Sequence, residues 1–198
     1  MKRTISAMRG PGSLKHNRRA FTAENVDAER TRYNVVYKDE PIKQVYHELF
    51  DDALERYNSK QKRKDRCISD YYEHLRTGKQ EKVFHELIVQ IGNKDNTGVT
   101  TEDGQWAATI LDEYMQDFEK RNPTLRVFGA FLHMDEATPH LHIDFIPYVS
   151  GWKGKGMDTK VSLKQALKAL GFAGGTKKES ELNQWINAEK EQLAAVME

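Results

Sequence analysis

The hydrophobic positions of the chain follow two periods, and their order predicts an α+β fold. Alternating or continuous short apolar runs indicate strands, and a period of 3.6 residues indicates helices. The expected strands are 3–8, 33–37, 83–91, 127–132 and 140–147. The expected helices are 41–57, 100–122, 162–170 and one from about residue 180. Because strands and helices do not alternate as βαβ units, we expect a central antiparallel sheet flanked by α-helices.

Local signals support several of these boundaries. Pro41 suits a first helical turn, Thr100 suits a helix cap, and Gly171 suits a helix end. The last helix has one apolar side, which either packs on the sheet or begins a partner-binding segment.

Length and composition favour one domain in an oxidant-poor compartment. With 198 residues, we expect a single domain over 1–198, in which 151–198 is a C-terminal loop and helical extension. The one cysteine, Cys67, excludes an internal disulfide. The sequence shows no secretion signal and no apolar run of membrane length, so a cytoplasmic protein without a membrane partner is expected.

Positive charge is localised although the net charge is only +1. Residues 1–23 hold six basic side chains and no acidic one, and two further clusters lie in 60–66 and in a glycine-rich loop. Such patches suit a phosphate backbone, with a solvated surface as the alternative for each. The predicted DNA-binding residues are Lys2, Arg3, Arg9, Lys15, Arg18, Lys62, Arg63, Lys64, Lys153 and Lys155.

The most chemically informative segment is 133–142, which holds three histidines and two carboxylates. It is predicted to be a hairpin with its turn at 135–139. His140 and His142 then share one strand face, and His133 lies on the facing strand. Three converging imidazoles predict a divalent metal site, since burying them unpartnered would be costly. The alternative is a set of hydrogen-bonded histidines.

Two acidic residues of the turn have open roles at this stage. Glu136 is a fourth metal ligand, a general base, or a group that orients another side chain. Asp135 is expected to stabilise the turn through its own backbone.

Three segments together resemble a known family. His16, Asn17 and Arg19 resemble the HNxR motif of the MobV (Pre/Mob) plasmid-mobilisation relaxases. Residues 27–30 with Asn34 are similar to the family's next block, and 133–142 matches its HxDExxPHxH motif without a gap. Residues 126–148 and 162–172 also look similar. The resemblance covers most of the chain, and its histidine motif is highly specific.

The resemblance implies an HUH-type relaxase fold and a single-strand DNA endonuclease activity. Such an enzyme nicks the transfer origin of a plasmid or mobile element by transesterification and stays linked to the 5′ phosphate, which begins conjugative mobilisation. The matched positions imply His16 as the nucleophile and His133, His140 and His142 as metal ligands. Glu136 would orient or deprotonate the nucleophile or complete the coordination. Arg19 would neutralise the scissile phosphate or position His16.

Cofactor and partners follow from the same reading. Manganese is the first choice, because phosphoryl transfer needs exchangeable open positions; magnesium, zinc and nickel are the alternatives. The expected partner is single-stranded or hairpin transfer-origin DNA, together with other mobilisation or coupling proteins. Family members usually continue into a long C-terminal region used for assembly, so we expect a compact member or one domain of a longer protein, with dimers formed through such a region.

Two other functions remain open. A rolling-circle replication initiator would use a tyrosine nucleophile, for which Tyr71 and Tyr72 are the candidates, although their spacing with Leu75 also suits packing. A non-catalytic DNA-binding module would hold a structural zinc, which normally has a closed ligand set that often includes cysteine. Cys67 lies far from the histidine motif in the sequence, which weakens this alternative.

Overall fold

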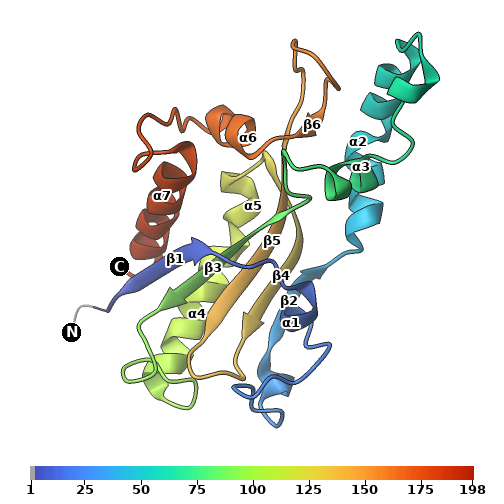
Figure 1. The fold of residues 1–198 in the computed structure, drawn as a ribbon. Coiled ribbons are helices and arrows are strands. Elements are labelled where there is room, and N and C mark those ends of the chain that lie inside the picture. The colour runs from blue at the N-terminus through green and yellow to red at the C-terminus, as the bar shows by residue number, and fades with distance from the viewer. Residues whose placement is uncertain (1–2) are drawn as a thin grey trace.

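The computed structural model describes residues 3–198 and consists of one twisted sheet with helices on both faces (Figure 1). The strands are β1 (Ile5–Arg9), β2 (Val35–Asp39), β3 (His85–Ile91), β4 (Leu125–His133), β5 (His140–Val149) and β6 (Lys160–Val161). The helices are α1 (Leu14–Asn17), α2 (Ile42–Ser59), α3 (Tyr71–Thr77), α4 (Glu102–Gln116), α5 (Phe118–Arg121), α6 (Leu163–Ala169) and α7 (Glu181–Val196). Two 3-10 turns lie at Thr31–Tyr33 and Lys64–Arg66.

The sheet is antiparallel throughout and runs in the order β1-β3-β5-β4-β2, with β6 paired to β5. The predicted hairpin of β4 and β5 therefore lies at its centre. This confirms the predicted α+β class with an antiparallel sheet. Successive residues of a strand point to opposite faces, so the central strand β5 serves two different environments.

One face of the sheet packs on α4, α6 and α7. Leu141, Ile143 and Phe145 of β5 are fully buried there, and Trp185 of α7 lies against Phe145 with ring centroids 5.5 Å apart. The last helix thus packs on the sheet, which was one of its two expected roles; the other was the start of a partner-binding segment. The helical part of 151–198 contributes to the same core.

The other face carries a smaller apolar cluster at one end of the sheet. Ile146 of β5 and Phe128 of β4 pack there with Val45, Phe50 and Tyr71 of α2 and α3. The α2–α3 pair extends away from the sheet, as Figure 1 shows. Nearer the β4–β5 turn, the face is covered by the short helix α1 rather than by a long one, which leaves room for polar side chains.

Three local predictions need correction. The cap of α4 is Thr101 rather than Thr100, and its hydroxyl accepts a hydrogen bond from the backbone N–H of Gly104. The helix expected over 100–122 breaks at Asp117 into α4 and α5. His16, placed in a loop by the sequence, lies on α1. Short helices bury too few apolar residues to leave a periodic pattern.

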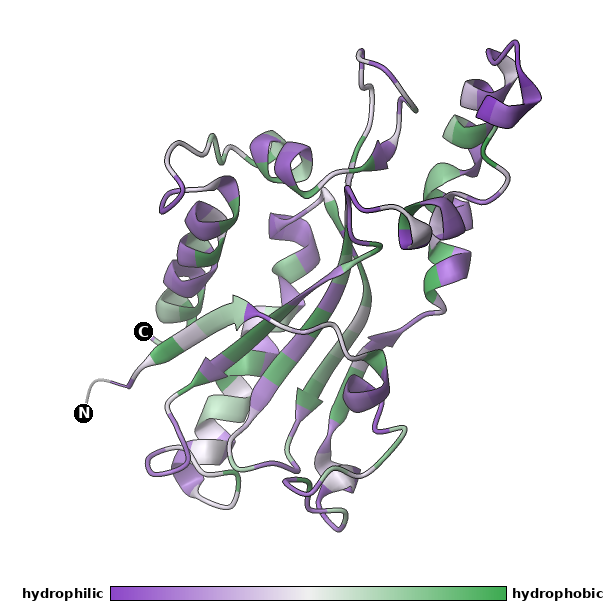
Figure 2. Ribbon diagram, in the orientation of Figure 1, coloured by the Kyte–Doolittle hydropathy of each residue, from purple (hydrophilic) through white to green (hydrophobic). Residues whose placement is uncertain are grey.

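Hydropathy follows this layering. In Figure 2 green and purple bands alternate along the central strands, whereas the outer end of the α2–α3 pair is mostly purple. None of the described helices has an apolar segment long enough to cross a membrane.

Candidate active site

Three histidines converge on the two central strands. His140 and His142 lie on one face of β5, and His133 at the end of β4 is in register with His140. The ring centroids of these three residues lie 4.5 to 5.4 Å apart. All three side chains are buried. The predicted convergence is therefore present in the structure.

Each of the three imidazoles has one nitrogen held by an oxygen. The partners are the backbone carbonyl of Asn17 for His133 Nε2 at 3.0 Å, that of Thr138 for His140 Nδ1 at 2.8 Å, and Glu86 Oε1 for His142 Nδ1 at 2.6 Å. An oxygen acceptor requires the proton on that nitrogen, which leaves the lone pair on the other. Outer oxygens orient metal-binding histidines in the same way.

The remaining nitrogens fit a metal. His133 Nδ1 and His142 Nε2 are buried and have no hydrogen-bond partner among residues 3–198. Burial lowers the pKa of His133 to about 2 and also lowers that of His140, so both imidazoles are neutral and their lone pairs are available. Buried, unpartnered lone pairs on neutral imidazoles are the donor set that a divalent transition metal takes.

The candidate ligand atoms form two overlapping sets, each with all atoms within 4.8 Å of one another. One joins His16, His133 and His142, and the other joins His133, Glu136 and His140. The predicted histidine trio is thus divided between two sets that share His133. Glu136 belongs to the cluster through Oε1, 3.7 Å from His140 Nε2 and 3.8 Å from His133 Nδ1.

His16 lies over the cluster from α1. Its ring centroid is 5.4 Å from that of His142 and 5.6 Å from that of His133, and its Nε2 is 3.2 Å from Glu136 Oε1. Its side chain keeps some solvent access, unlike the three strand histidines. Burial, together with the charge of Arg19, lowers the pKa of His16, so the imidazole is neutral at pH 7.

Arg19 is held by carboxylates rather than free for a ligand. Its guanidinium donates to Asp135 at 2.6 and 2.9 Å, to Glu136 Oε1 at 2.7 Å and to the carbonyl of His16 at 3.0 Å. Arg19 has a φ of 53°, a left-handed conformation that costs a non-glycine residue about 1 kcal/mol or more. Its ion pairs offset that cost. Of the two roles expected for Arg19, this arrangement favours positioning of His16 over contact with a phosphate.

Asp135 has a larger part than the turn role expected for it. It is fully buried and accepts hydrogen bonds from Arg19, Thr31 and Asn34. Burial opposes ionisation, but these donors outweigh it and hold the pKa of Asp135 well below its usual range. Asn34 also accepts a hydrogen bond from the N–H of Met134 at 2.6 Å. Asn34, which belongs with residues 27–30 to the second segment that resembles the family, therefore holds the turn that carries Glu136.

The polar residues of the site that were not assigned a role from the sequence include Asn17, Asn25, Glu86 and Asp144. Asn17 is buried and donates to Glu86 Oε1 and Asp144 Oδ2, both at 2.9 Å. Glu86 also accepts from the N–H of Gly12 at 2.7 Å, and Asn25 donates to Glu136 Oε2 at 2.7 Å. Burial raises the pKa of Asp144 to about 7. Asp144 could have been found, because it lies two residues after His142 on the same strand face.

A pocket of about 590 Å³ adjoins the cluster. His16, His140, His142 and Glu136 border it, and Met8, Phe21 and Ile88 are among its other lining residues. The site is therefore open to a ligand from one side.

None of the predicted DNA-binding residues that the structure describes lines this pocket. Lys2 lies outside the described residues. The exposed residues include Arg9, Lys15, Lys62, Lys64, Lys153 and Lys155. The other three make ion pairs, Arg3 with Asp103, Arg18 with Asp39 and Arg63 with Asp65. Arg9 borders a neighbouring pocket with Lys82, a basic residue to which the sequence analysis gave no role. These two pockets share Pro11 and Glu86, so Arg9 and Lys82 border a pocket that adjoins the site.

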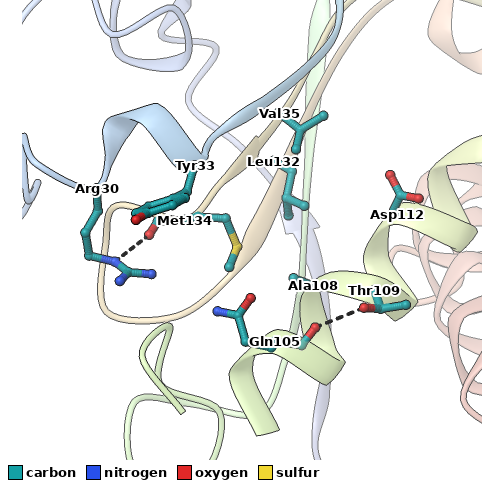
Figure 3. Close-up of a pocket in the computed structure, with 9 residues that line it drawn as sticks. All are labelled: Arg30, Tyr33, Val35, Gln105, Ala108, Thr109, Asp112, Leu132 and Met134. Carbon is teal, nitrogen blue, oxygen red and sulfur yellow. Dashed lines mark hydrogen bonds between the residues drawn. The ribbon is translucent and has the colours of Figure 1, made fainter. Parts of the chain in front are cut away.

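A further hollow, of about 420 Å³, lies between β2, α4 and the end of β4 (Figure 3). Its lining includes no histidine, and its one carboxylate, Asp112, accepts a hydrogen bond from the hydroxyl of Tyr37. Arg30 points toward the carbonyl of Met134 and donates to it at 3.0 Å. This hollow lacks the groups that a metal or a nucleophilic reaction needs.

The alternative nucleophiles lie in the smaller apolar cluster. Tyr71 packs on Tyr46 and Phe50, and its hydroxyl accepts a hydrogen bond from the N–H of Val161 at 3.0 Å. Burial raises the pKa of Tyr71 to about 12, which weakens it as a nucleophile. Neither Tyr71 nor Tyr72 borders the histidine pocket.

The fold and the site define an α+β protein with a histidine centre suited to a divalent metal. The sequence model of the Mob_Pre family, plasmid recombination enzymes, matches residues 17–192, and the chain belongs to that family. The matched range holds every predicted metal ligand but begins just after His16. No curated protein matches the chain.

Solved structures of the MobM relaxase domain (MOBV; Mob_Pre) bound to plasmid pMV158 oriT DNA, with manganese, are similar to this chain. One, with a 22-nucleotide DNA and a 3′ thiophosphate, is 19% identical, covers 93% of this chain and 85% of its own, and has a TM-score of 0.48. Another, with a 23-nucleotide DNA, is 20% identical, covers 81% and 73%, and has a TM-score of 0.48.

Proposed function

We propose that this chain is a metal-dependent relaxase of the HUH type, which nicks one strand of a plasmid transfer origin by transesterification through His16. The observation that carries the proposal is the position of a neutral, partly accessible imidazole over a cluster of buried histidines with unpartnered nitrogens. Membership of the plasmid recombination enzymes supports a mobilisation role. The MobM relaxase domain, in the same family, is bound to oriT DNA and manganese in its solved structures.

His133, His140 and His142 would hold the metal, with Glu136 beside them. A divalent ion bound there would supply charge stabilisation to the oxygens of the scissile phosphate. The hydrogen bonds of Asn17, Thr138 and Glu86 fix the tautomer of each histidine. Manganese, with magnesium, zinc and nickel as alternatives, remains the proposed ion.

The chemical step uses His16 and Glu136. The lone pair of the imidazole attacks phosphorus, the bond from phosphorus to the 3′ oxygen breaks, and a phosphoramidate to the 5′ phosphate forms. The imidazolium created by this attack loses its proton to Glu136, whose Oε1 is 3.2 Å from His16 Nε2. Glu136 then donates the proton to the leaving 3′ oxygen. The reverse sequence reseals the strand.

Arg19 acts in this scheme as a positioning residue. It joins the carbonyl of His16 to Glu136 and Asp135, so the nucleophile and its proton acceptor are held by one guanidinium. The backbone strain at Arg19 follows from bringing α1 over the turn.

The test is capture of a covalent adduct. The protein is incubated with manganese and a labelled single strand from its own transfer origin, and denaturing electrophoresis is used to detect a protein-bound label. We expect an adduct that is lost in His16→Ala, kept in Tyr71→Phe and Tyr72→Phe, and released by mild acid, because a phosphoramidate is acid-labile. An adduct that maps to Tyr71 or Tyr72, or that survives acid, contradicts the assignment of His16.

A structural zinc without catalysis has less support. The described residues place no cysteine in either candidate ligand set, and Cys67 is exposed near the outer end of α2. A set left open on the pocket side is more typical of a catalytic site than of a structural one.

A further inference from the structure

One row of side chains crosses the sheet from the histidine cluster to the β1 edge. Ile88 is in register with His142 on one side and with Met8 on the other. Adjacent strands lie about 4.8 Å apart, so this row extends roughly 10 Å from a proposed metal ligand to Met8. Both apolar residues border the pocket beside the histidines.

Phe21 adds an aromatic ring to the same pocket. Its ring centroid lies 6.5 Å from that of His16, with the two planes at 55°. Met8 and Phe21 are 53% and 50% exposed. Single exposed apolar side chains are common, but two large ones that border the same pocket beside a polar cluster form the kind of patch that marks a binding site. We call Met8, Phe21 and Ile88 the apolar shelf.

The charges of the pocket decide what kind of group the shelf binds. No lysine or arginine borders the pocket, so the apolar shelf itself offers no cation to a phosphate. Its other polar lining residues include Ser13, Asn25 and Gln90, which are neutral. Gln90 is in register with His140 and uses its amide nitrogen on the carbonyl of Gly92. A flat, largely apolar group with polar edges fits this lining, and a nucleobase is such a group.

We propose, on the basis of the proposed nicking function, that the apolar shelf holds the unstacked base of a nucleotide next to the scissile phosphate, with that base stacked on Phe21. A phosphate in contact with His16 places the neighbouring base within reach of a ring 6.5 Å away. Stacking on an aromatic side chain tolerates any base, since each has a π-face. The shelf thus positions the strand, and the amide oxygens of Asn25 and Gln90, whose nitrogens donate within the protein, accept from the base edge.

The test compares two strands of equal charge. One is an oligothymidylate of about twelve nucleotides, and the other has the same length and phosphates but abasic sugars throughout. Affinity is measured by fluorescence anisotropy with manganese present. For Phe21→Ala we expect the affinity for oligothymidylate to fall about 5- to 150-fold and the affinity for the abasic strand to be unchanged. Phe21→Trp should keep the affinity for both strands.

The matched control is Val36→Ala, which removes an exposed apolar side chain on β2, away from the pocket. It should change neither affinity. Equal weakening on both strands in Phe21→Ala, or no weakening on oligothymidylate, overturns the proposal. Phe21 is half exposed, so the variant should keep its fold, and its far-ultraviolet circular dichroism should match that of the wild type.

The outcomes separate this inference from the nicking function. If the wild type prefers oligothymidylate, Phe21→Ala loses that preference, and no adduct forms, the nicking function is overturned and the base-binding shelf stands. A wild type that forms the adduct but binds both strands equally overturns the shelf alone. A wild type that binds neither strand and forms no adduct with its own transfer origin overturns both.

Discussion

Glu86→Gln should weaken metal binding without removing any of the proposed ligands. Glu86 is buried and accepts three hydrogen bonds: from His142 Nδ1 and Asn17 Nδ2 at Oε1, and from the N–H of Gly12 at Oε2. Burial opposes its ionisation, yet these three donors outweigh burial and lower the pKa of Glu86. The carboxylate is therefore charged at neutral pH and surrounded by donors.

The expected loss of stability in Glu86→Gln follows from the number of hydrogen-bond acceptors that remain. Glutamine has one oxygen, so its amide nitrogen must face either the N–H of Gly12 or the donors of His142 and Asn17. One orphaned buried donor costs about 1–3 kcal/mol, and loss of the charge weakens the remaining bonds. We expect a stability loss of roughly 2–4 kcal/mol and a fall in manganese affinity of about 10- to 100-fold.

Calorimetric titration with manganese measures the affinity, and urea denaturation measures the stability. Glu119→Gln is the matched control, because Glu119 makes an exposed ion pair with Lys38 and lies outside the site; exposed pairs contribute about 0–1 kcal/mol. A Glu86→Gln variant whose manganese affinity stays within about twofold of the wild type would refute the view that Glu86 orients His142.

Three further predictions test other parts of the structure. His140→Ala or His142→Ala should abolish nicking in manganese while DNA affinity stays within about tenfold, because phosphate contacts come from elsewhere; full cleavage by both variants contradicts the metal site. Arg9→Ala and Lys82→Ala should each flatten the plot of log affinity against log salt by about 0.7 to 0.9, and an unchanged slope removes that residue from the phosphate contacts. His85, whose pKa burial lowers to about 4 from 6.5, should make the fold lose stability as pH falls from 6.5 to 4, because the unfolded state takes up the proton first. Urea denaturation at pH 7 and pH 4.5 checks this, and His85→Phe should lose less stability between the two than the wild type; an equal loss excludes His85 as the cause.

The histidine site was predictable from sequence because its members lie close together on a hairpin. The alternation of residues 140–147 decides which face each side chain occupies, and a short turn decides that His133 faces His140. Both are local properties. The α+β class followed from the same periodicities.

The outer part of the site depends on contacts between distant segments, which no local pattern encodes. Glu86 reaches His142 only because β3 pairs with β5 and places Ile88 opposite His142. Asn17 meets Asp144 across 127 positions of sequence. From the sequence alone, Glu86 is one acidic residue in an apolar strand and Asn17 is an asparagine after a histidine. Their contacts in the site follow only from the strand order and the position of α1.

The charges of the assembled site bear on whether a bound cation would be needed there for contact with the scissile phosphate. Glu86, Asp135 and Glu136 place three carboxylates around the histidines, and the guanidinium of Arg19 pairs with two of them. The imidazoles of His16, His133 and His140 are neutral because their pKa values are lowered. The site's own side chains therefore have a net negative charge, which repels a phosphate. A divalent cation held by the histidines would offset this charge, whereas an arginine aimed at the phosphate would be neutralised by the same carboxylates. We infer that Arg19 organises α1 and the turn, and that the affinity of the site for the scissile phosphate depends on the ion.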